Sequence, residues 1–178
     1  MAAIWPTFQS QFVRYLTSNK AKNEKETAKK IAQLYHQSVR TAMPTLIPGA
    51  MAIGLAPSVV EKGFAASFKI AKKGGKVRTN PATYMPAAMG LLAYWTGKTI
   101  NPAVPPPGFV PGVSNVVLVP GVPVAPQIMA AFNAKSPSAV ASGLVAAFST
   151  HMMSISGLFT GNPIGSPSPA PFPWVGVA

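Results

Sequence analysis

Apolar side chains recur about every 3.6 residues through much of the first half of the chain, and this spacing predicts amphipathic helices. Phe8, Phe12 and Leu16 form one such stripe, after a proline at position 6 that suits the first turn of a helix. Further periodic runs follow. The predicted helices cover residues 6–19, 23–43, 58–73 and 81–97. Asn80, followed by Pro81, is a candidate cap of the last one, whose true start Pro86 delays.

The run from Asn23 to Met43 has the clearest helix signals. Asn23 is a candidate N-cap, and Glu26 three residues later completes a reciprocal capping arrangement. Glu26 also precedes Lys30 by four residues, the order that favours an ion pair. Pro44 disfavours helical geometry in the residue before it, so the helix should end near Met43. One stripe should face the core, formed by Ala28, Ile31, Ala32, Tyr35, Val39 and Ala42.

The pattern changes in the second half, because residues 102–126 contain eight prolines and no helical period. Proline removes a backbone donor and fixes φ, so this stretch should be extended, with residues 115–119 as a short strand. A short helix is predicted over 126–135. A longer one, 136–159, has Ser136 as its cap, and the chain then closes on a second proline-rich stretch.

These patterns predict a mainly α fold, namely a small helical bundle with extended proline-rich arms and little β structure. Its first region, residues 1–98, is helical and basic. A proline-rich extended segment with a short strand and a short helix covers 99–135. An apolar helix that packs on the body covers 136–161, and a proline-rich C-terminal arm covers 162–178.

Charge is distributed unevenly along the chain. Fifteen Lys and Arg stand against three acids, which are Glu24, Glu26 and Glu61, for a formal net charge of +12. Fourteen of the basic residues and all three acids lie in residues 1–98, so Lys135 is the only fixed charge after them. Scattered charge keeps free monomers apart in solution. We therefore expect partner subunits to cover much of the neutral half.

The two proline-rich segments are rich in Val, Ile, Phe and Trp, which favour burial. Proline lowers the entropy lost on ordering, so an apolar, polyproline-like arm is suited to lying in a groove on another subunit. We expect copies of this chain and other structural proteins to hold these arms. The residues expected at that interface are Phe109, Val110, Val117, Leu118, Phe172, Trp174 and Val175.

The basic half contains two lysine clusters that could contact phosphates, an acidic partner or solvent. Arginine is scarce, which argues against reading of bases, because bidentate contacts to bases favour arginine. The first cluster is Lys20, Lys22, Lys25, Lys29 and Lys30. The second is Lys69, Lys72, Lys73, Lys76 and Arg78.

Catalytic and cofactor motifs are not found. The "GKT" at 97–99 lacks the glycine that a phosphate-binding loop needs at position 92, where Leu92 stands, and it follows a helical pattern rather than a strand. The chain has no cysteine, which excludes disulfides and thiolate sites. Two histidines and three glutamates at these spacings match no zinc or calcium site. We expect no enzyme activity, no cofactor and no metal.

His36 and His151 are the only histidines. Acid–base chemistry would need a carboxylate to orient the imidazole, and all carboxylates lie in the first 61 residues. His151 lies near Ser149, Thr150 and Ser154, so activation of a serine competes with the ordinary interpretation of a hydrogen-bonded or interfacial histidine.

The predicted helix 136–159 is also the main candidate for a membrane span, since it is uncharged and long enough to cross a bilayer. Its many hydroxyl residues make it only moderately hydrophobic, and the proline-rich flanks would leave backbone groups unpaired in lipid. Small residues repeat every fourth position from Ser138 to Ser154, with a bulky side opposite. No secretion signal is apparent at the N-terminus.

Alanine-rich helices, proline-rich arms, small size and the lack of cysteine together resemble minor structural proteins of tailed bacteriophage virions, above all those of tails and baseplates. The stretches that carry this resemblance are "LLAYWTGKTINPAVPPPG", "HMMSISGLF" and "PFPWVGV". It implies an architectural role in many copies in the tail, baseplate or neck of a virion assembled in the host cytoplasm. The sequence thus predicts a non-catalytic structural subunit. A basic protein that contacts nucleic-acid phosphates non-specifically and a membrane-embedded subunit are the alternatives.

Overall fold

The structure is a computed structural model that describes residues 5–18, 23–46, 51–53, 55–73, 80–96, 99–101, 115–119, 123–160 and 171–172. Side chains are described for residues 5–18, 23–41, 55–72, 80–96 and 123–155.

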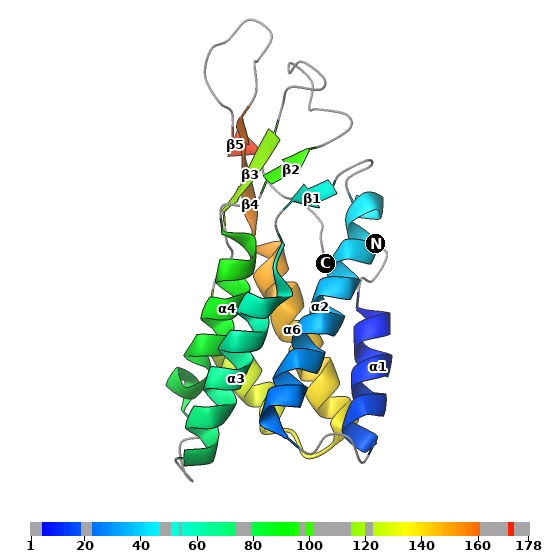
Figure 1. Cartoon of the computed structure of the whole chain (residues 1–178), viewed down its shortest axis with the longest axis vertical. Coiled ribbons are helices and arrows are strands. Elements are labelled where there is room, and N and C mark those ends of the chain that lie inside the picture. The colour runs from blue at the N-terminus through cyan, green and yellow to red at the C-terminus, as the bar shows by residue number, and fades with distance from the viewer. Residues whose placement is uncertain are drawn as a thin grey trace, which may run out of the picture.

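The described chain is mainly helical, with a small sheet at one end (Figure 1). Its helices are α1 (Pro6–Thr17), α2 (Glu24–Leu46), α3 (Pro57–Lys73), the 3-10 helix η2 (Pro81–Tyr84), α4 (Met85–Trp95), α5 (Ala125–Phe132) and α6 (Pro137–Met153). Its strands are β1 (Met51–Ile53), β2 (Thr99–Asn101), β3 (Asn115–Val119), β4 (Ser156–Thr160) and β5 (Pro171–Phe172). The predicted fold class, a small helical bundle with little β structure, is confirmed.

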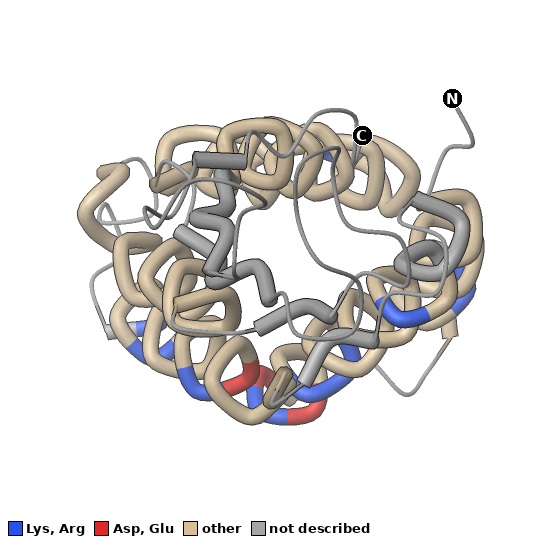
Figure 2. The backbone as a smooth tube through the Cα atoms, turned by 90° about the horizontal axis from the view of Figure 1, so that it is seen from above, with Lys and Arg blue, Asp and Glu red and all other residues tan. Residues whose placement is uncertain are grey.

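The six α-helices close into a ring. Each helix from α1 to α5 packs against the next one along the chain, and α6 packs against α1. Figure 2, which looks down on the bundle, shows this ring of helices. The ring buries one apolar face of each helix toward a shared centre, which is the arrangement that the 3.6-residue periodicity requires.

The five strands form one antiparallel sheet in the order β1-β2-β3-β4-β5. Helices are inserted between sequential strands: α3, η2 and α4 connect β1 to β2, and α5 and α6 connect β3 to β4. Each insertion leaves the sheet and returns to it, so the sheet lies across one end of the bundle (Figure 1). The predicted strand 115–119 is confirmed as β3.

Aromatic rings fill the centre of the ring of helices, and Phe148 of α6 is the residue on which they converge. This side chain is fully buried. It contacts rings from α1, α2, α3 and the residue before α1, with centroid distances of 5.4 Å to Trp5, 5.2 Å to Phe8, 5.0 Å to Tyr35 and 6.4 Å to Phe64. Most of these pairs are edge-to-face or tilted, the geometry that the ring quadrupole favours.

Helices α3 and α4 approach each other closely where Gly63 faces Gly90. A Cβ atom on Gly63 would lie 2.5 Å from the carbonyl oxygen of Pro86 and 3.1 Å from the Cα of Gly90. A Cβ atom on Gly90 would lie 2.8 Å from the carbonyl oxygen of Val59. These distances are too short for real contacts, so the two helices can approach this closely only because both positions are glycine.

Ser67 of α3 caps the start of α4 with a hydrogen bond. Tyr84, the residue before α4, makes no side-chain capping hydrogen bond. Instead the backbone N–H of Ala87 donates to Ser67 Oγ, at 3.0 Å, in a buried position. A hydroxyl from a neighbouring helix thus satisfies one of the backbone donors that every helix start leaves unpaired.

The predicted helix caps are present. The N–H of Glu26 donates to Asn23 Oδ1 at 2.7 Å, that of Ala82 to Asn80 Oδ1 at 2.9 Å, and that of Ala139 to Ser136 Oγ at 3.2 Å. The predicted core stripe of α2 is buried from Ala28 to Val39, while the side chain of Ala42 lies outside the described residues.

Two predicted helix ends were wrong. The predicted helix 136–159 stops at Met153, and residues 156–160 form β4. Ile155 and Phe159 fit the helical period, but β4 pairs with all five residues of β3, and periodicity in a short apolar run cannot separate helix from strand. Helix α2 also continues through Pro44 to Leu46. Pro44 has a helix-compatible φ but no N–H to donate, so the helix continues past it with one backbone hydrogen bond fewer.

The proline-rich segments were predicted as arms, and their described residues include two strands of the sheet. Val117 and Leu118 lie in β3, and Phe172 lies in β5, which pairs with β4. Their backbones therefore pair within the chain. Strands β1, β2, β4 and β5 were not predicted. The other expected interface residues, Phe109, Val110, Trp174 and Val175, lie outside the described residues.

Candidate functional site

The described members of the two lysine clusters predicted from sequence lie at the end of the bundle opposite the sheet. Helix α2 begins at this end and α3 finishes beside it (Figure 1). The contact is marked by an ion pair between Lys72 Nζ and Glu24 Oε1, at 3.7 Å. We call this region, formed by the first turns of α2 and the last turns of α3, the basic end.

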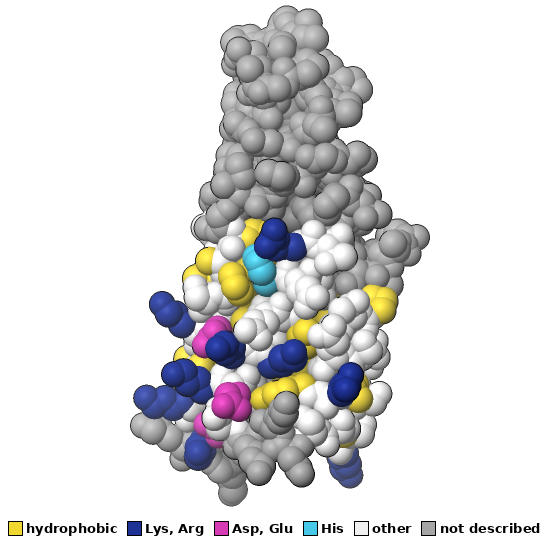
Figure 3. All heavy atoms as spheres, turned by 45° about the vertical axis from the view of Figure 1, so that its right-hand side comes forward, with side chains coloured by type: hydrophobic (Ala, Val, Ile, Leu, Met, Phe, Trp, Pro, Cys, Tyr) yellow, Lys and Arg dark blue, Asp and Glu magenta, His cyan; other side chains and the backbone are white. Residues whose placement is uncertain are grey.

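The described lysines of the basic end are mostly exposed. Lys25 and Lys29 of α2 and Lys69 and Lys72 of α3 are exposed, and Lys30 is half-buried. Figure 3 shows dark blue basic side chains gathered on the lower part of the helical body, with acidic ones among them. The other members of the two predicted clusters, namely Lys20, Lys22, Lys73, Lys76 and Arg78, have no described side chains.

The acids of this region lie at the start of α2, and one of them pairs with a lysine. Glu24 and Glu26 lie in the first turn of α2, where carboxylates interact favourably with the helix dipole. The predicted Glu26–Lys30 pair is not formed between these two described side chains; Glu24 pairs with Lys72 instead. The Lys72 side chain is 72% exposed, and a pair of this kind contributes about 0–1 kcal/mol. Lys72 can therefore exchange Glu24 for another anion at little cost.

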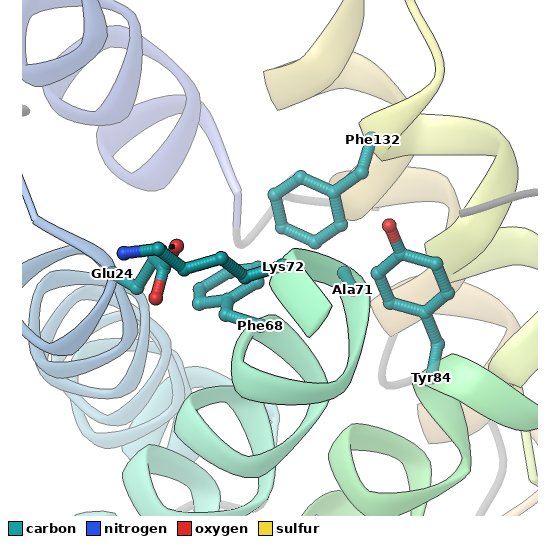
Figure 4. A pocket seen from close by; sticks show the side chains of 6 residues that line it. All are labelled: Glu24, Phe68, Ala71, Lys72, Tyr84 and Phe132. Atoms are coloured by element: carbon teal, nitrogen blue, oxygen red, sulfur yellow. Dashed lines mark ion pairs between the residues drawn. The ribbon is translucent and has the colours of Figure 1, made fainter. Parts of the chain in front are cut away.

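Two hollows adjoin at the basic end. One, of about 160 Å³, is lined by aromatic and apolar side chains of α3, η2 and α5 with an ion pair at its side: Phe68, Ala71, Tyr84, Phe132, Lys72 and Glu24 (Figure 4). The other, of about 290 Å³, is lined by Asn23, Glu24, Lys25 and Lys72. We call the first the aromatic pocket. It shares Glu24 and Lys72 with the second, so an apolar hollow opens directly beside a polar one.

The rings of the aromatic pocket are held by one another. Phe132 and Tyr84 are stacked, with centroids 5.7 Å apart and planes 9° apart. Phe68 meets Phe132 edge to face at 5.0 Å. Tyr84 is buried, whereas Phe68 and Phe132 are half-buried. The pocket thus presents two partly accessible rings beside the buried ring of Tyr84.

His36 lies elsewhere, on α2, and is hydrogen-bonded to α4. Its Nδ1 and the Tyr94 hydroxyl are 2.7 Å apart. Burial, and then the positive charge of Arg40, hold the pKa of His36 below its ordinary value of 6.5. Burial raises the pKa of Tyr94 far above its ordinary value, so the hydroxyl that meets the imidazole keeps its proton. Nearby, Trp95 Nε1 donates to the Tyr35 hydroxyl at 2.8 Å.

His151 is fully buried in α6. Two of the neighbouring hydroxyls are engaged with the backbone: Ser154 Oγ donates to the carbonyl of His151 at 2.7 Å, and Thr150 Oγ1 to that of Ala146 at 3.0 Å. Because both hydroxyls donate to backbone carbonyls, neither hydrogen bond is the one to the His151 imidazole that activation of a nucleophile would need. Among the residues that the structure describes, no three His, Cys, Asp or Glu side chains gather as metal ligands.

The opposite side of the ring of helices is almost without charge. In the described residues 80–96 and 123–155, which form η2 and α4 to α6, Lys135 is the only charged residue. Many exposed positions there are small or apolar, including Ser142 and Ala146 of α6 and three methionines, Met85, Met89 and Met153, that are 43%, 52% and 61% exposed. Figure 2 shows the basic residues concentrated along one side of the ring. We call the surface of α4 to α6 the uncharged face.

The small-residue repeat predicted along α6 lies on this face. Ser138, Ser142 and Ala146 are exposed, while the opposite bulky side is buried, with Leu144, Phe148 and Met152 in the core. Within the described part of the chain, no helix combines the length and apolar character that a bilayer span requires.

Comparison with known proteins shows no match: no protein-family model, no curated protein and no solved structure is significantly similar to this chain. Periodicity placed Phe68 on a helix and Phe132 in a short one, but it gave no sign that they meet. The aromatic pocket was therefore not predicted from the sequence, which contains no motif linking residues this far apart.

Proposed function

We propose that this chain is a non-catalytic structural subunit of a large protein assembly, with the uncharged face as its contact surface. The observation that carries the proposal is the separation of charge around the bundle: α1 to α3 hold the described charges except Lys135, while the exposed residues of α4 to α6 are uncharged and are mostly Ala, Ser and Met.

An exposed surface of this composition is suited to close packing. Small side chains let another backbone approach, and exposed methionines adapt to an irregular partner. Protein interfaces are depleted in charged residues at their core and enriched in Met. Helix α6 has 17 residues and is about 25 Å long, so its outer face spans the width of a standard interface.

The setting we propose is the virion of a tailed bacteriophage, in its tail, baseplate or neck. This part of the proposal rests on the resemblance in composition and sequence pattern described above. The partners are then copies of this chain and other structural proteins. The proline-rich C-terminal residues 162–178 supply a further contact, and the basic end is left for a different partner.

The test is the native mass of the particle that contains the chain, measured by light scattering, with charge introduced at matched positions. Ala146 of α6 and Ala66 of α3 are both exposed alanines in helices of 17 residues. Ala146→Lys should release an 18.5 kDa monomer, because it buries an unpaired charge at the contact. Ala66→Lys adds the same charge on the basic side and should leave the mass unchanged. A wild-type chain that is a stable monomer contradicts the proposal.

The C-terminal contact is tested separately by a chain that ends at Gly161. This chain should keep the helical circular dichroism of the bundle and fail to enter the assembly. Unchanged incorporation would remove residues 162–178 from the proposed contact and leave the uncharged face as the sole candidate.

A further inference from the structure

The basic end combines two features that the structural role does not require, an aromatic pocket and a cluster of exposed lysines around it. Two of the pocket's rings are partly accessible, those of Phe68 and Phe132. Lys72 belongs both to this pocket and to the adjoining polar hollow, and Lys25 lines the second hollow only. Figure 4 shows Lys72 and Glu24 on one side of the pocket and the rings of Phe132 and Tyr84 on the other.

The size of the pocket limits its occupant. Sites for drug-sized molecules are about 300–1,000 Å³, whereas this pocket is about 160 Å³. It admits a single flat ring system rather than a larger ligand. An occupant with one ring for the pocket and negative charge beside it, for the lysines, would fit both hollows at once.

We propose that the basic end binds single-stranded nucleic acid, with one unpaired base in the aromatic pocket and the neighbouring phosphates on Lys72, Lys25 and Lys69. Aromatic rings beside a positive groove are the general means by which proteins bind single strands without sequence preference. The scarcity of arginine agrees with binding that does not read bases. This inference goes beyond the structural role and does not depend on it.

A single strand fits these features better than the other polyanions that lysines attract. A duplex keeps its bases stacked and paired, so it could contact the lysines but not fill the pocket. An acidic peptide has its charges on flexible side chains and offers no ring next to each charge. The weak Lys72–Glu24 pair is also easily exchanged for a phosphate, since both side chains are well exposed, at 72% and 46%.

The experiment measures binding of a fluorescein-labelled 12-nucleotide thymidine strand by anisotropy, on the full chain, over a series of salt concentrations. The wild type should bind this strand more tightly than a duplex of the same length. Phe132→Leu keeps an apolar side chain but removes the stacking ring, and should weaken single-strand binding by about 5- to 150-fold. The duplex affinity should stay as in the wild type.

Lysine variants test the phosphate contacts. Lys72→Ala should reduce the slope of log affinity against log salt by about 0.7, the value for one phosphate contact on a single strand. Lys62→Ala is the matched control, because Lys62 is an exposed lysine of the same helix, ten residues away, or about 15 Å along its axis. The salt slope of this control should equal that of the wild type.

Several outcomes overturn the proposal: a duplex bound as tightly as the strand, a Phe132→Leu chain that binds like the wild type, or equal slopes for the two lysine variants. Polyglutamate that binds more tightly than the strand would instead assign the basic end to an acidic protein. Circular dichroism verifies that Phe132→Leu is folded, and Phe68→Leu probes the same pocket from α3 if it is not. A negative result in these binding experiments would not affect the test of the structural role, which is the native mass of the particle.

Discussion

Replacement of Gly63 by alanine tests the close crossing of α3 and α4. In an exposed helix, glycine to alanine stabilises a protein by about 1 kcal/mol, because alanine loses less backbone entropy on folding. At Gly63 the added methyl would lie 2.5 Å from the carbonyl oxygen of Pro86, and ordinary contact begins at 3.4 Å. The obstacle is backbone, so it cannot rotate away, and the helices must separate by about 0.9 Å at this point.

Overpacking of this kind costs about 1–3 kcal/mol, and separation of α3 from α4 also loosens the packing around the crossing. The propensity gain of about 1 kcal/mol offsets part of this cost, so the expected net loss of stability is about 0–2 kcal/mol. For a chain of this size that lowers Tm by up to about 8 °C. Urea unfolding followed by circular dichroism measures the free energy, and calorimetry measures Tm.

Two controls make the outcome specific to the crossing. Lys62→Ala changes an exposed neighbour in the same turn and should alter stability by less than about 0.5 kcal/mol. Gly90→Ala should destabilise for the same reason as Gly63→Ala, and the double variant should lose less than the sum, since the first methyl has already moved the helices apart. A Gly63→Ala chain that is more stable than the wild type by about 1 kcal/mol would refute the close approach.

Three further predictions concern the polar contacts of the bundle. Ser67→Ala leaves a buried N–H of α4 without its acceptor and should cost about 1–2 kcal/mol in urea unfolding; an unchanged midpoint would exclude a capping role. Tyr35→Phe removes the buried acceptor of Trp95 Nε1 and should cost about 1–3 kcal/mol, with a matching shift in tryptophan fluorescence that a purely remote effect would not produce. Because burial lowers the pKa of His36, the unfolded chain takes up this proton first. Stability should therefore fall as the pH drops below about 6.5, and His36→Gln should remove part of that slope; equal slopes would contradict the lowered pKa.

The local structure of this chain was largely readable from its sequence. Helix starts were marked by Asn23, Asn80 and Ser136, whose side chains cap the backbone in the structure. The strand 115–119 was marked by an uninterrupted β-branched and leucine run between prolines. Both signals are local, because a cap acts on backbone groups two or three residues away and a proline acts on its own neighbours. The concentration of charged residues in the first 98 positions was also evident from the sequence.

The end of α6 and the strands β1, β2 and β4 were decided by tertiary structure. Residues 156–160 have an apolar spacing compatible with a helix, and they become a strand because β3 offers five residues of backbone to pair with. No local property of the segment provides that partner. Pairing between strands separated by two helices is a nonlocal event, so it leaves no signal at a fixed spacing in the sequence.

The candidate sites divide in the same way. The sequence by itself determined that lysines cluster near residues 20–30 and 69–78, that α4 to α6 are almost uncharged, and that Phe68 and Phe132 lie on helices. Only the ring of helices brought the start of α2 beside the end of α3 and set Phe132 against Tyr84 and Phe68. Periodicity fixes which face of a helix is buried. It does not fix which other helix that face meets, because the hydrophobic effect is not directional and shape complementarity selects the partner.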